Sequence, residues 1–135
     1  MVKAPQPASL TVLVVDDVRD VRVSYRYLLE LQGFQVILAA DPHEALGAIR
    51  NEKIDIVLID LYIPGPMDGL GLIDFIRRQF LHPPVLIAMS GDPHVAYRSS
   101  LQAARYVGAD ATLMKPIAPA ELVSTILRLV AAIRV

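Results

Sequence analysis

Short, mainly apolar runs alternate with amphipathic stretches five times along this chain, and this order constrains the fold more than any other feature. Each run has the length of a buried strand, and each stretch is long enough for a helix. The predicted strands cover residues 10–15, 35–39, 54–59, 85–89 and 111–114, and the predicted helices cover 21–31, a segment beginning at 41, 70–78, a segment from 92 to about 107, and 119–133. Asp41 and Asp68 are predicted N-caps. Strands that alternate with helices form a parallel sheet with right-handed crossovers.

We therefore expect an α/β fold of five βα units, in which a parallel five-stranded sheet of order 2-1-3-4-5 carries helices on both faces, as in flavodoxin-like proteins. Hydrophobic residues make up 54% of the chain and charged residues 20%, which suits strands that are buried on both sides. A dinucleotide-binding fold would need a glycine-rich turn after the first strand. Here that turn contains Asp16 and Asp17, whose charges would repel a pyrophosphate.

Length, charge and composition exclude several classes of protein. The 135 residues suit one domain, which we assign to residues 10–135, after a flexible N-terminal extension at residues 1–9. The net charge of −1 gives no field for nucleic acid or an anionic membrane, so neither is predicted as a partner. The chain has no cysteine, which excludes disulfides and thiol catalysis, and its longest apolar run of five residues cannot span a membrane. Because residues 1–9 contain no signal-peptide core, a cytoplasmic location is expected by default.

Polar side chains follow four of the five predicted strands. Asp16 and Asp17 follow the first strand, Asp60 the third, Ser90 the fourth and Lys115 the fifth. In the order 2-1-3-4-5 these four strands are neighbours, and ligands of such sheets bind beyond the carboxyl ends of the strands. Two carboxylates about 4 Å apart repel each other by roughly 4 kcal/mol at an intermediate dielectric constant. We therefore expect a divalent cation in this crevice, and a few hard oxygen ligands suit Mg²⁺ that keeps several waters.

The same residue types suit phosphoryl transfer onto a carboxylate. Aspartate is a known nucleophile that forms an aspartyl phosphate, and Asp60 is the best candidate because it stands alone at the end of a central strand. The adjacent Asp16 and Asp17 are better placed to hold the metal. Lys115 would add a fixed positive charge, and the Ser90 hydroxyl could donate to a phosphoryl oxygen.

Taken together, these motifs resemble the receiver domain of bacterial two-component response regulators, with its chemotaxis-regulator-like fold. The resemblance covers roughly residues 10–133 and rests on the type, order and spacing of Asp16-Asp17, Asp60 with Pro64 and Met67-Asp68-Gly69 after it, Ser90-Gly91, and Lys115-Pro116. Any one of these motifs is a weak signal. The ordered set at successive strand ends is a specific one.

The resemblance implies a role for each of these residues. It implies that Asp60 is the phosphoacceptor, and that Asp17, Asp60 and the Tyr62 carbonyl bind Mg²⁺ directly while Asp16 acts largely through water. It also implies that Lys115 pairs with the phosphoryl group and that Ser90 is the switch hydroxyl. Tyr62 and Asp92 are implied to modulate the lifetime of the phosphoryl group. Thr112 departs from the family pattern, because an aromatic residue coupled to the switch hydroxyl usually stands three residues before the lysine. The implied phosphodonor is a histidine kinase or a histidine phosphotransfer protein.

Two other functions remain open at this stage. A pseudo-receiver would be an interaction module without phosphorylation, and Thr112 keeps that reading in view. A phosphatase of the haloacid dehalogenase type would also use a strand-end aspartate. It would need a second aspartate two residues later, where this chain has Tyr62. We therefore expect a signalling switch that catalyses only its own phosphorylation and dephosphorylation.

The last predicted helix has an apolar stripe wider than one helix needs to cover a sheet. The stripe consists of Leu122, Val123, Ile126, Leu127, Leu129, Val130 and Ile133. Deep packing would explain it, and so would an exposed patch. Because the family often uses this region for output, we expect a homodimer or an output partner to bind the last two helices and the fifth strand.

Overall fold

The computed structural model describes residues 6–91 and 95–134, with residues 95–100 and 134 described by their backbone alone. Within these residues five parallel strands form one sheet of order β2-β1-β3-β4-β5, as predicted. The strands are β1 (Thr11–Val15), β2 (Gln35–Ala39), β3 (Ile56–Asp60), β4 (Val85–Ser90) and β5 (Ala111–Met114), and the helices are η1 (Pro7–Ser9), α1 (Arg19–Leu31), α2 (Pro42–Asn51), α3 (Gly69–Gln79), α4 (Val95–Val107) and α5 (Pro119–Arg134). The predicted start of α4 at Asp92 lies outside the described residues.

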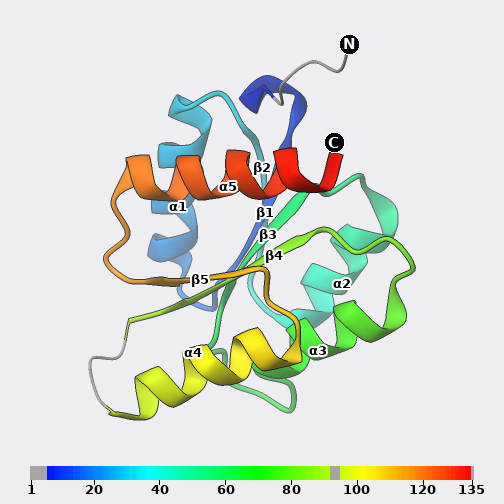
Figure 1. Cartoon of the computed structure of the whole chain (residues 1–135), viewed down its shortest axis with the longest axis vertical. Helices are drawn as coiled ribbons and strands as arrows, with labels where there is room; N and C mark the ends of the chain where they lie inside the picture. Colours follow the sequence, from blue (N-terminus) through cyan, green and yellow to red (C-terminus); the bar gives the residue numbers. More distant parts are fainter. Residues whose placement is uncertain (1–5, 92–94, 135) are drawn as a thin grey trace.

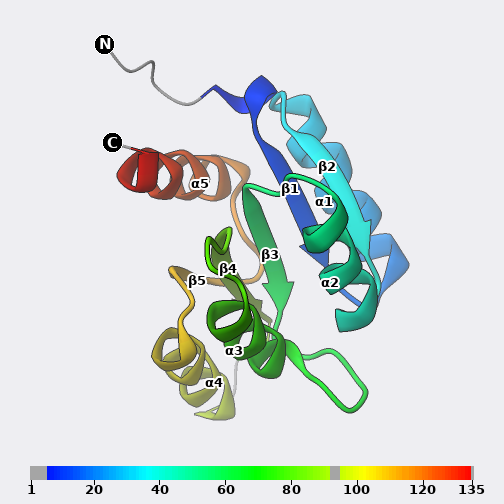
Figure 2. The ribbon, with the colours of Figure 1, turned by 90° about the vertical axis from the view of Figure 1, so that its right-hand side faces the viewer.

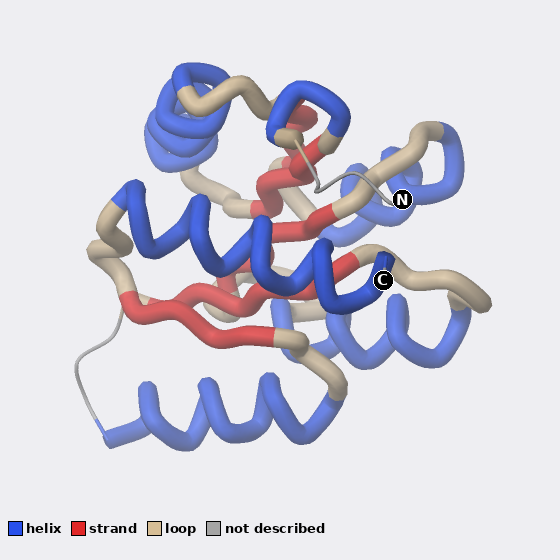
Figure 3. Tube along the Cα trace, turned by 45° about the horizontal axis from the view of Figure 1, so that its top comes forward, coloured by secondary structure: helices blue, strands red, loops and turns tan. Residues whose placement is uncertain are grey.

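The helices form two layers, one on each face of the sheet (Figures 1 and 3). Side chains alternate between the faces along each strand. In β1, Val12 and Val14 pack toward α1 and α5, whereas Leu13 and Val15 pack toward α2, α3 and α4. On that second face α3 and α4 lie side by side (Figure 2). Every residue of β3 is buried, so the strand that ends at Asp60 is packed closely on both of its faces.

Two aspartates fix the amino ends of the strands. Asp55 Oδ2 accepts a hydrogen bond of 2.9 Å from the Thr11 backbone N–H, and Asp110 Oδ2 accepts one of 2.8 Å from that of Leu86. Arg77 of α3 also donates to Asp110 Oδ2, at 2.9 Å. These contacts hold β1 and β4 at their starts, and the register of a sheet then determines which residues emerge together at its other end.

The helix caps place α2 and α3 as predicted. Asp41 Oδ1 accepts from the Glu44 backbone N–H at 2.8 Å, and Asp68 Oδ1 accepts from that of Gly71 at 2.8 Å. Each bond satisfies an N–H that the first turn of a helix leaves without a partner. The Asp68 cap starts α3 only eight residues after the end of β3 at Asp60, so this helix closes the loop beside the predicted site.

The apolar stripe of α5 packs mostly inward. Leu122, Ile126 and Val130 are buried, and Val123, Leu127 and Leu129 are partly buried against the same core cluster. Ile133 is 63% exposed. Deep packing thus explains most of the stripe, while the predicted partner surface on α4, β5 and α5 stays a prediction. Among the described helices, none combines the length and the apolar character needed to cross a bilayer.

Candidate functional site

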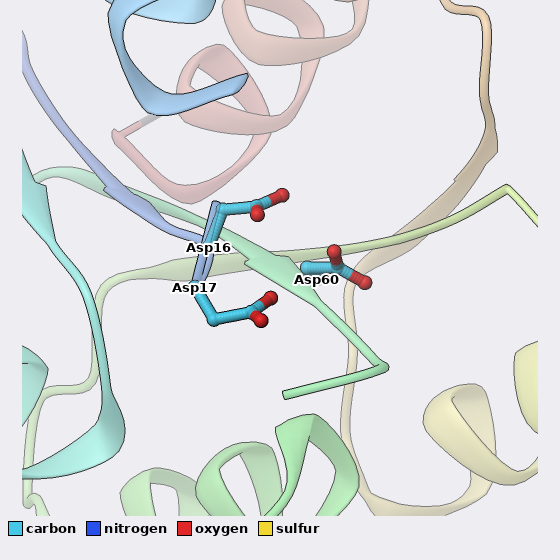
Figure 4. A group of neighbouring side chains, drawn as sticks. All are labelled: Asp16, Asp17 and Asp60. Carbon is cyan, nitrogen blue, oxygen red and sulfur yellow. The ribbon is translucent and has the colours of Figure 1, made fainter. Parts of the chain in front are cut away.

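Three carboxylates meet at the carboxyl end of the sheet. Asp16 and Asp17 follow β1, Asp60 ends β3, and one oxygen from each lies within 4.8 Å of the others. Figure 4 shows the Asp16 and Asp17 side chains pointing toward the side on which Asp60 lies. Asp16 and Asp60 are buried, whereas Asp17 is exposed. The strand order alone brings these residues together, because β1 and β3 are direct neighbours with Val15 opposite Ile59.

Lys115 supplies a positive charge to the cluster. Its Nζ lies 3.1 Å from Asp16 Oδ2 and 3.2 Å from Asp60 Oδ2, so it bridges the ends of β1 and β3. The Lys115 backbone N–H donates to the Ser90 carbonyl at 2.8 Å, which extends the pairing of β5 with β4. Burial lowers the pKa of Lys115, but the attraction of Asp60 and Asp16 outweighs burial and raises the pKa overall. The lysine therefore stays protonated at neutral pH.

Backbone N–H groups hold the other oxygens of the two buried carboxylates. Val18 N–H donates to Asp16 Oδ1 at 3.0 Å, and Tyr62 N–H donates to Asp60 Oδ1 at 2.9 Å. Each buried aspartate is thus fixed at one oxygen by the loop that follows it and at the other by Lys115. Such fixed donors orient the carboxylates without moving charge at the moment of reaction.

Ser90 ends β4 beside the cluster, as predicted. It is fully buried, and within the described residues its Oγ has no hydrogen-bond partner. Thr112 on β5 stands opposite Ala88, so it lies on the same face of the sheet as Ser90 and is partly buried. A buried hydroxyl without a partner costs stability, and it is available to a group that enters the site.

A cavity of about 580 Å³ opens beside the cluster. It is lined by Asp17, Leu61, Tyr62, Ile63, Pro64, Asp68 and Leu70. The Tyr62 side chain is 46% exposed at this opening. The cavity leaves Asp17 and the loop after Asp60 open to a small molecule from solvent. The predicted metal contact through the Tyr62 carbonyl stays a prediction, and Asp92 lies outside the described residues.

The chemistry of the donor set fits Mg²⁺. Carboxylate oxygens are the ligands this ion prefers, and one exposed carboxylate leaves room for the waters it retains. Lys115 balances only part of the negative charge of three carboxylates, so a divalent cation would stabilise the cluster.

Comparison with known protein families decides the class of this domain. The family model described as the response regulator receiver domain matches residues 12–127. The chain belongs to the response regulator receiver family. The matched range contains every strand residue except Thr11, the first residue of β1. It also contains the three clustered carboxylates and the lysine that pairs with two of them: Asp16, Asp17, Asp60 and Lys115. The resemblance seen in the strand-end motifs is therefore confirmed, and the response regulators are proteins of two-component signal transduction.

Individual response regulators are similar over most of this receiver domain. It is 34% identical to the alkaline phosphatase synthesis transcriptional regulatory protein PhoP of Bacillus subtilis, over 82% of this chain and 44% of PhoP. It is 38% identical to the response regulator MprA of Mycobacterium sp. strain KMS, over 84% of this chain and 47% of MprA. The chain thus spans less than half the length of these relatives.

Solved receiver domains share the fold along nearly their whole length. The CheY-like receiver domain protein of Methanospirillum hungatei matches with a TM-score of 0.76 and 28% identity, over 90% of this chain and 93% of that chain. The receiver domain of NtrX from Brucella abortus matches with a TM-score of 0.80 and 28% identity, over 88% of this chain and 97% of that chain.

One polar contact at the receiver site escaped the sequence-based reasoning. Arg22 Nη1 donates to the Asp16 carbonyl at 2.8 Å, from the first turn of α1. The sequence carries only a weak signal for it, because Arg22 lies among amphipathic residues whose spacing indicates a helix and nothing more. A long side chain near a helix start can reach back to the preceding strand, but spacing alone does not say that it does.

Removing the Asp60 charge is expected to stabilise the metal-free domain at neutral pH. Burial raises the pKa of Asp60; the Tyr62 N–H and Lys115 lower it, and Asp16 raises it further, with a net upward direction. The folded state thus binds a proton more tightly than the unfolded state, and the free energy of unfolding falls as pH rises toward the raised pKa. Asp60→Asn lacks this titration. Urea denaturation in EDTA from about pH 4 to about pH 7 should show the variant gaining stability relative to wild type. A difference that is constant with pH would contradict the raised pKa.

Proposed function

We propose that this receiver domain is a phosphoacceptor, in which Asp60 takes a phosphoryl group in a Mg²⁺-dependent reaction and switches a signalling surface. The observation that supports this most strongly is the meeting of Asp16, Asp17 and Asp60 within 4.8 Å, with Lys115 bridging two of them. If Lys115 served only as part of a structural ion pair, one carboxylate would be enough to balance its charge. Three carboxylates around one amine leave negative charge that an additional cation would neutralise.

The transfer step uses one Asp60 oxygen as the nucleophile. This oxygen forms a bond to phosphorus while the bond from phosphorus to the donor breaks, and the donor atom keeps the electron pair. With phosphohistidine the leaving group is the imidazole nitrogen, and with acetyl phosphate it is acetate. The Tyr62 N–H holds Asp60 Oδ1 at 2.9 Å, so Oδ2, which faces Lys115 at 3.2 Å, is the oxygen placed to react.

Mg²⁺ would be held by Asp17, Asp60 and the Tyr62 carbonyl, with Asp16 acting largely through water. When bound, the ion neutralises charge that develops on the transferred phosphoryl oxygens. Lys115 has two carboxylate partners before the reaction. After transfer, its ammonium group can pair with the phosphoryl oxygens instead, because Asp60 Oδ2 then carries the phosphorus.

The switch begins at Ser90. Its buried hydroxyl, which lacks a partner within the described residues, can donate to a phosphoryl oxygen on Asp60. Phosphorylation would thus favour one of two states of the β4 end, and the shift would reach the face made by α4, β5 and α5. Thr112 shares the sheet face of Ser90 and stands where the family usually has an aromatic residue. Tyr62 and Asp92 modulate the lifetime of the phosphoryl group.

The phosphodonor is a histidine kinase or a histidine phosphotransfer protein, the donors of two-component systems. PhoP is named a transcriptional regulatory protein. For this chain we propose output through a homodimer or another partner at α4, β5 and α5.

Phosphorylation by a small donor tests this proposal directly. We expect wild-type protein to gain one phosphoryl group from acetyl phosphate when Mg²⁺ is present and none in EDTA, as measured by intact-protein mass spectrometry. Failure to bind either Mg²⁺ or beryllium fluoride would favour an interaction module without phosphorylation. Rapid turnover of an unrelated phosphoester would favour the phosphatase.

A further inference from the structure

Arg22 holds the backbone of the acidic turn from inside α1. Its Nη1 donates to the Asp16 carbonyl at 2.8 Å, and its side chain is partly buried. We propose that Arg22 is a positioning residue for the magnesium site, which orients the Asp16–Asp17 turn so that both carboxylates face Asp60. This inference rests on the proposed function, because it assigns Arg22 a role in binding the metal that the phosphoryl transfer needs.

A hydrogen bond that fixes the Asp16 carbonyl also fixes the orientation of the peptide group between Asp16 and Asp17. The Asp16 carbonyl and the Asp17 N–H belong to one planar peptide group, so an orientation imposed on the oxygen is imposed on the bond that leads to the Asp17 Cα. On the other side of Asp17, the Val18 N–H is held by Asp16 Oδ1 at 3.0 Å. Asp17 itself is exposed, so core packing does not enclose its side chain. The backbone orientation at Asp17 therefore depends on the two hydrogen bonds that flank it, one to the Asp16 carbonyl and one from the Val18 N–H.

The start of α1 gives this bond further weight. Val18, the N-cap residue, makes no side-chain capping bond in the described part of the chain, whereas Asp41 and Asp68 cap α2 and α3. The turn from β1 to α1 is thus held by Asp16 and Arg22 in place of a cap. The Asp16 backbone N–H donates to the Ala39 carbonyl at 3.2 Å, so both backbone polar groups of Asp16 are engaged.

Arginine suits this position for an electrostatic reason as well. Its guanidinium is always charged and carries several donors in a fixed plane. Lys115 occupies one oxygen of Asp16 and one of Asp60. Arg22, by contrast, binds a carbonyl, so its positive charge lies near the cluster while the carboxylate oxygens stay available to a metal.

Calorimetric titration of the whole 135-residue chain with Mg²⁺ tests the proposal. We expect Arg22→Met to weaken Mg²⁺ binding about tenfold, the scale on which residues that orient metal ligands act. The Mg²⁺ affinity of Arg22→Lys, whose shorter side chain offers one donor group, should lie between that of wild type and that of Arg22→Met. The urea midpoint of Arg22→Met in EDTA should fall by no more than the loss of one hydrogen bond explains, because the main effect is on the orientation of the ligands.

Arg26 provides the matched control, since it lies one turn further along α1. Its Nε lies 3.9 Å from Glu30 Oε1, in an ion pair that is exposed to solvent. Arg26→Met should bind Mg²⁺ as wild type does. Wild-type affinity in Arg22→Met, or equal losses in Arg22→Met and Arg26→Met, would overturn the positioning role. A lower affinity together with a urea midpoint lowered by far more than one lost hydrogen bond explains would also overturn it. If Arg22→Met does not fold, Arg22→Lys decides, and full wild-type affinity in that variant overturns the role. A wild-type protein that binds no Mg²⁺ would instead overturn the proposed function itself.

Discussion

Alanine at position 69 is expected to destabilise the domain by about 3 kcal/mol, at the upper end of the cost of overpacking. Gly69 is the first residue of α3, and a Cβ there would lie 2.4 Å from the Asp60 carbonyl oxygen and 2.6 Å from the Leu61 Cα. Both are backbone atoms, one in the last residue of β3 and one in the residue after it, so neither can rotate away. Either α3 or the end of β3 has to shift. Urea denaturation measures the loss against a total stability of about 5–15 kcal/mol for a domain of this kind.

Gly69→Ala is also expected to slow phosphorylation, because the displaced backbone carries Asp60, the proposed nucleophile. A displacement of about 1 Å at a reacting group can cost on the order of 100-fold in rate. Gly47 in α2 is the matched control, since a Cβ there meets nothing within 4 Å. Gly47→Ala should raise the free energy of unfolding by up to about 1 kcal/mol, the helix preference of alanine over glycine, and leave phosphorylation unchanged. Wild-type stability in Gly69→Ala would contradict the close approach of α3 to β3.

The strand ends of the site could be predicted because the topology of a parallel sheet places them. Once five strands alternate with helices, the order 2-1-3-4-5 brings Asp16, Asp60 and Lys115 to one edge, whatever their side chains do in detail. The period of two along β1 and β3 likewise sets which residues face each helical layer. These features depend on the order of elements along the chain, which the sequence carries directly.

Contacts made by side chains that reach between elements could not be predicted in the same way. Arg22 reaches back from α1 to the Asp16 carbonyl, and Arg77 reaches from α3 to Asp110. In the sequence both are ordinary charged residues of amphipathic helices. The contact of Gly69 with the end of β3 depends on the distance between two backbones, which packing sets after the elements have formed. Glycine after an aspartate cap is equally compatible with an ordinary helix start.

Asp60→Asn is expected to reduce phosphorylation from acetyl phosphate by more than about 1,000-fold, since loss of the nucleophile costs at least this much in well-studied enzymes. An amide nitrogen has no free electron pair for attack, and an amide oxygen is a poor nucleophile. The asparagine oxygen can still accept the Tyr62 N–H bond that Asp60 Oδ1 accepts at 2.9 Å. The fold should therefore persist, so the loss reports on chemistry. Intact-protein mass spectrometry with Mg²⁺ present gives the rate.

Asp74→Asn is the control for this change, because it makes the same chemical replacement on α3 away from the cluster. Asp74 pairs with Arg78 at 2.8 Å on the surface, with 40% of its side chain exposed. Its loss should cost at most about 1 kcal/mol and leave the rate unchanged. Phosphoryl uptake that persists in Asp60→Asn would move the acceptor to another residue. Peptide mapping would then name it, with Asp17 the first to examine because it lines the cavity through which a donor would enter.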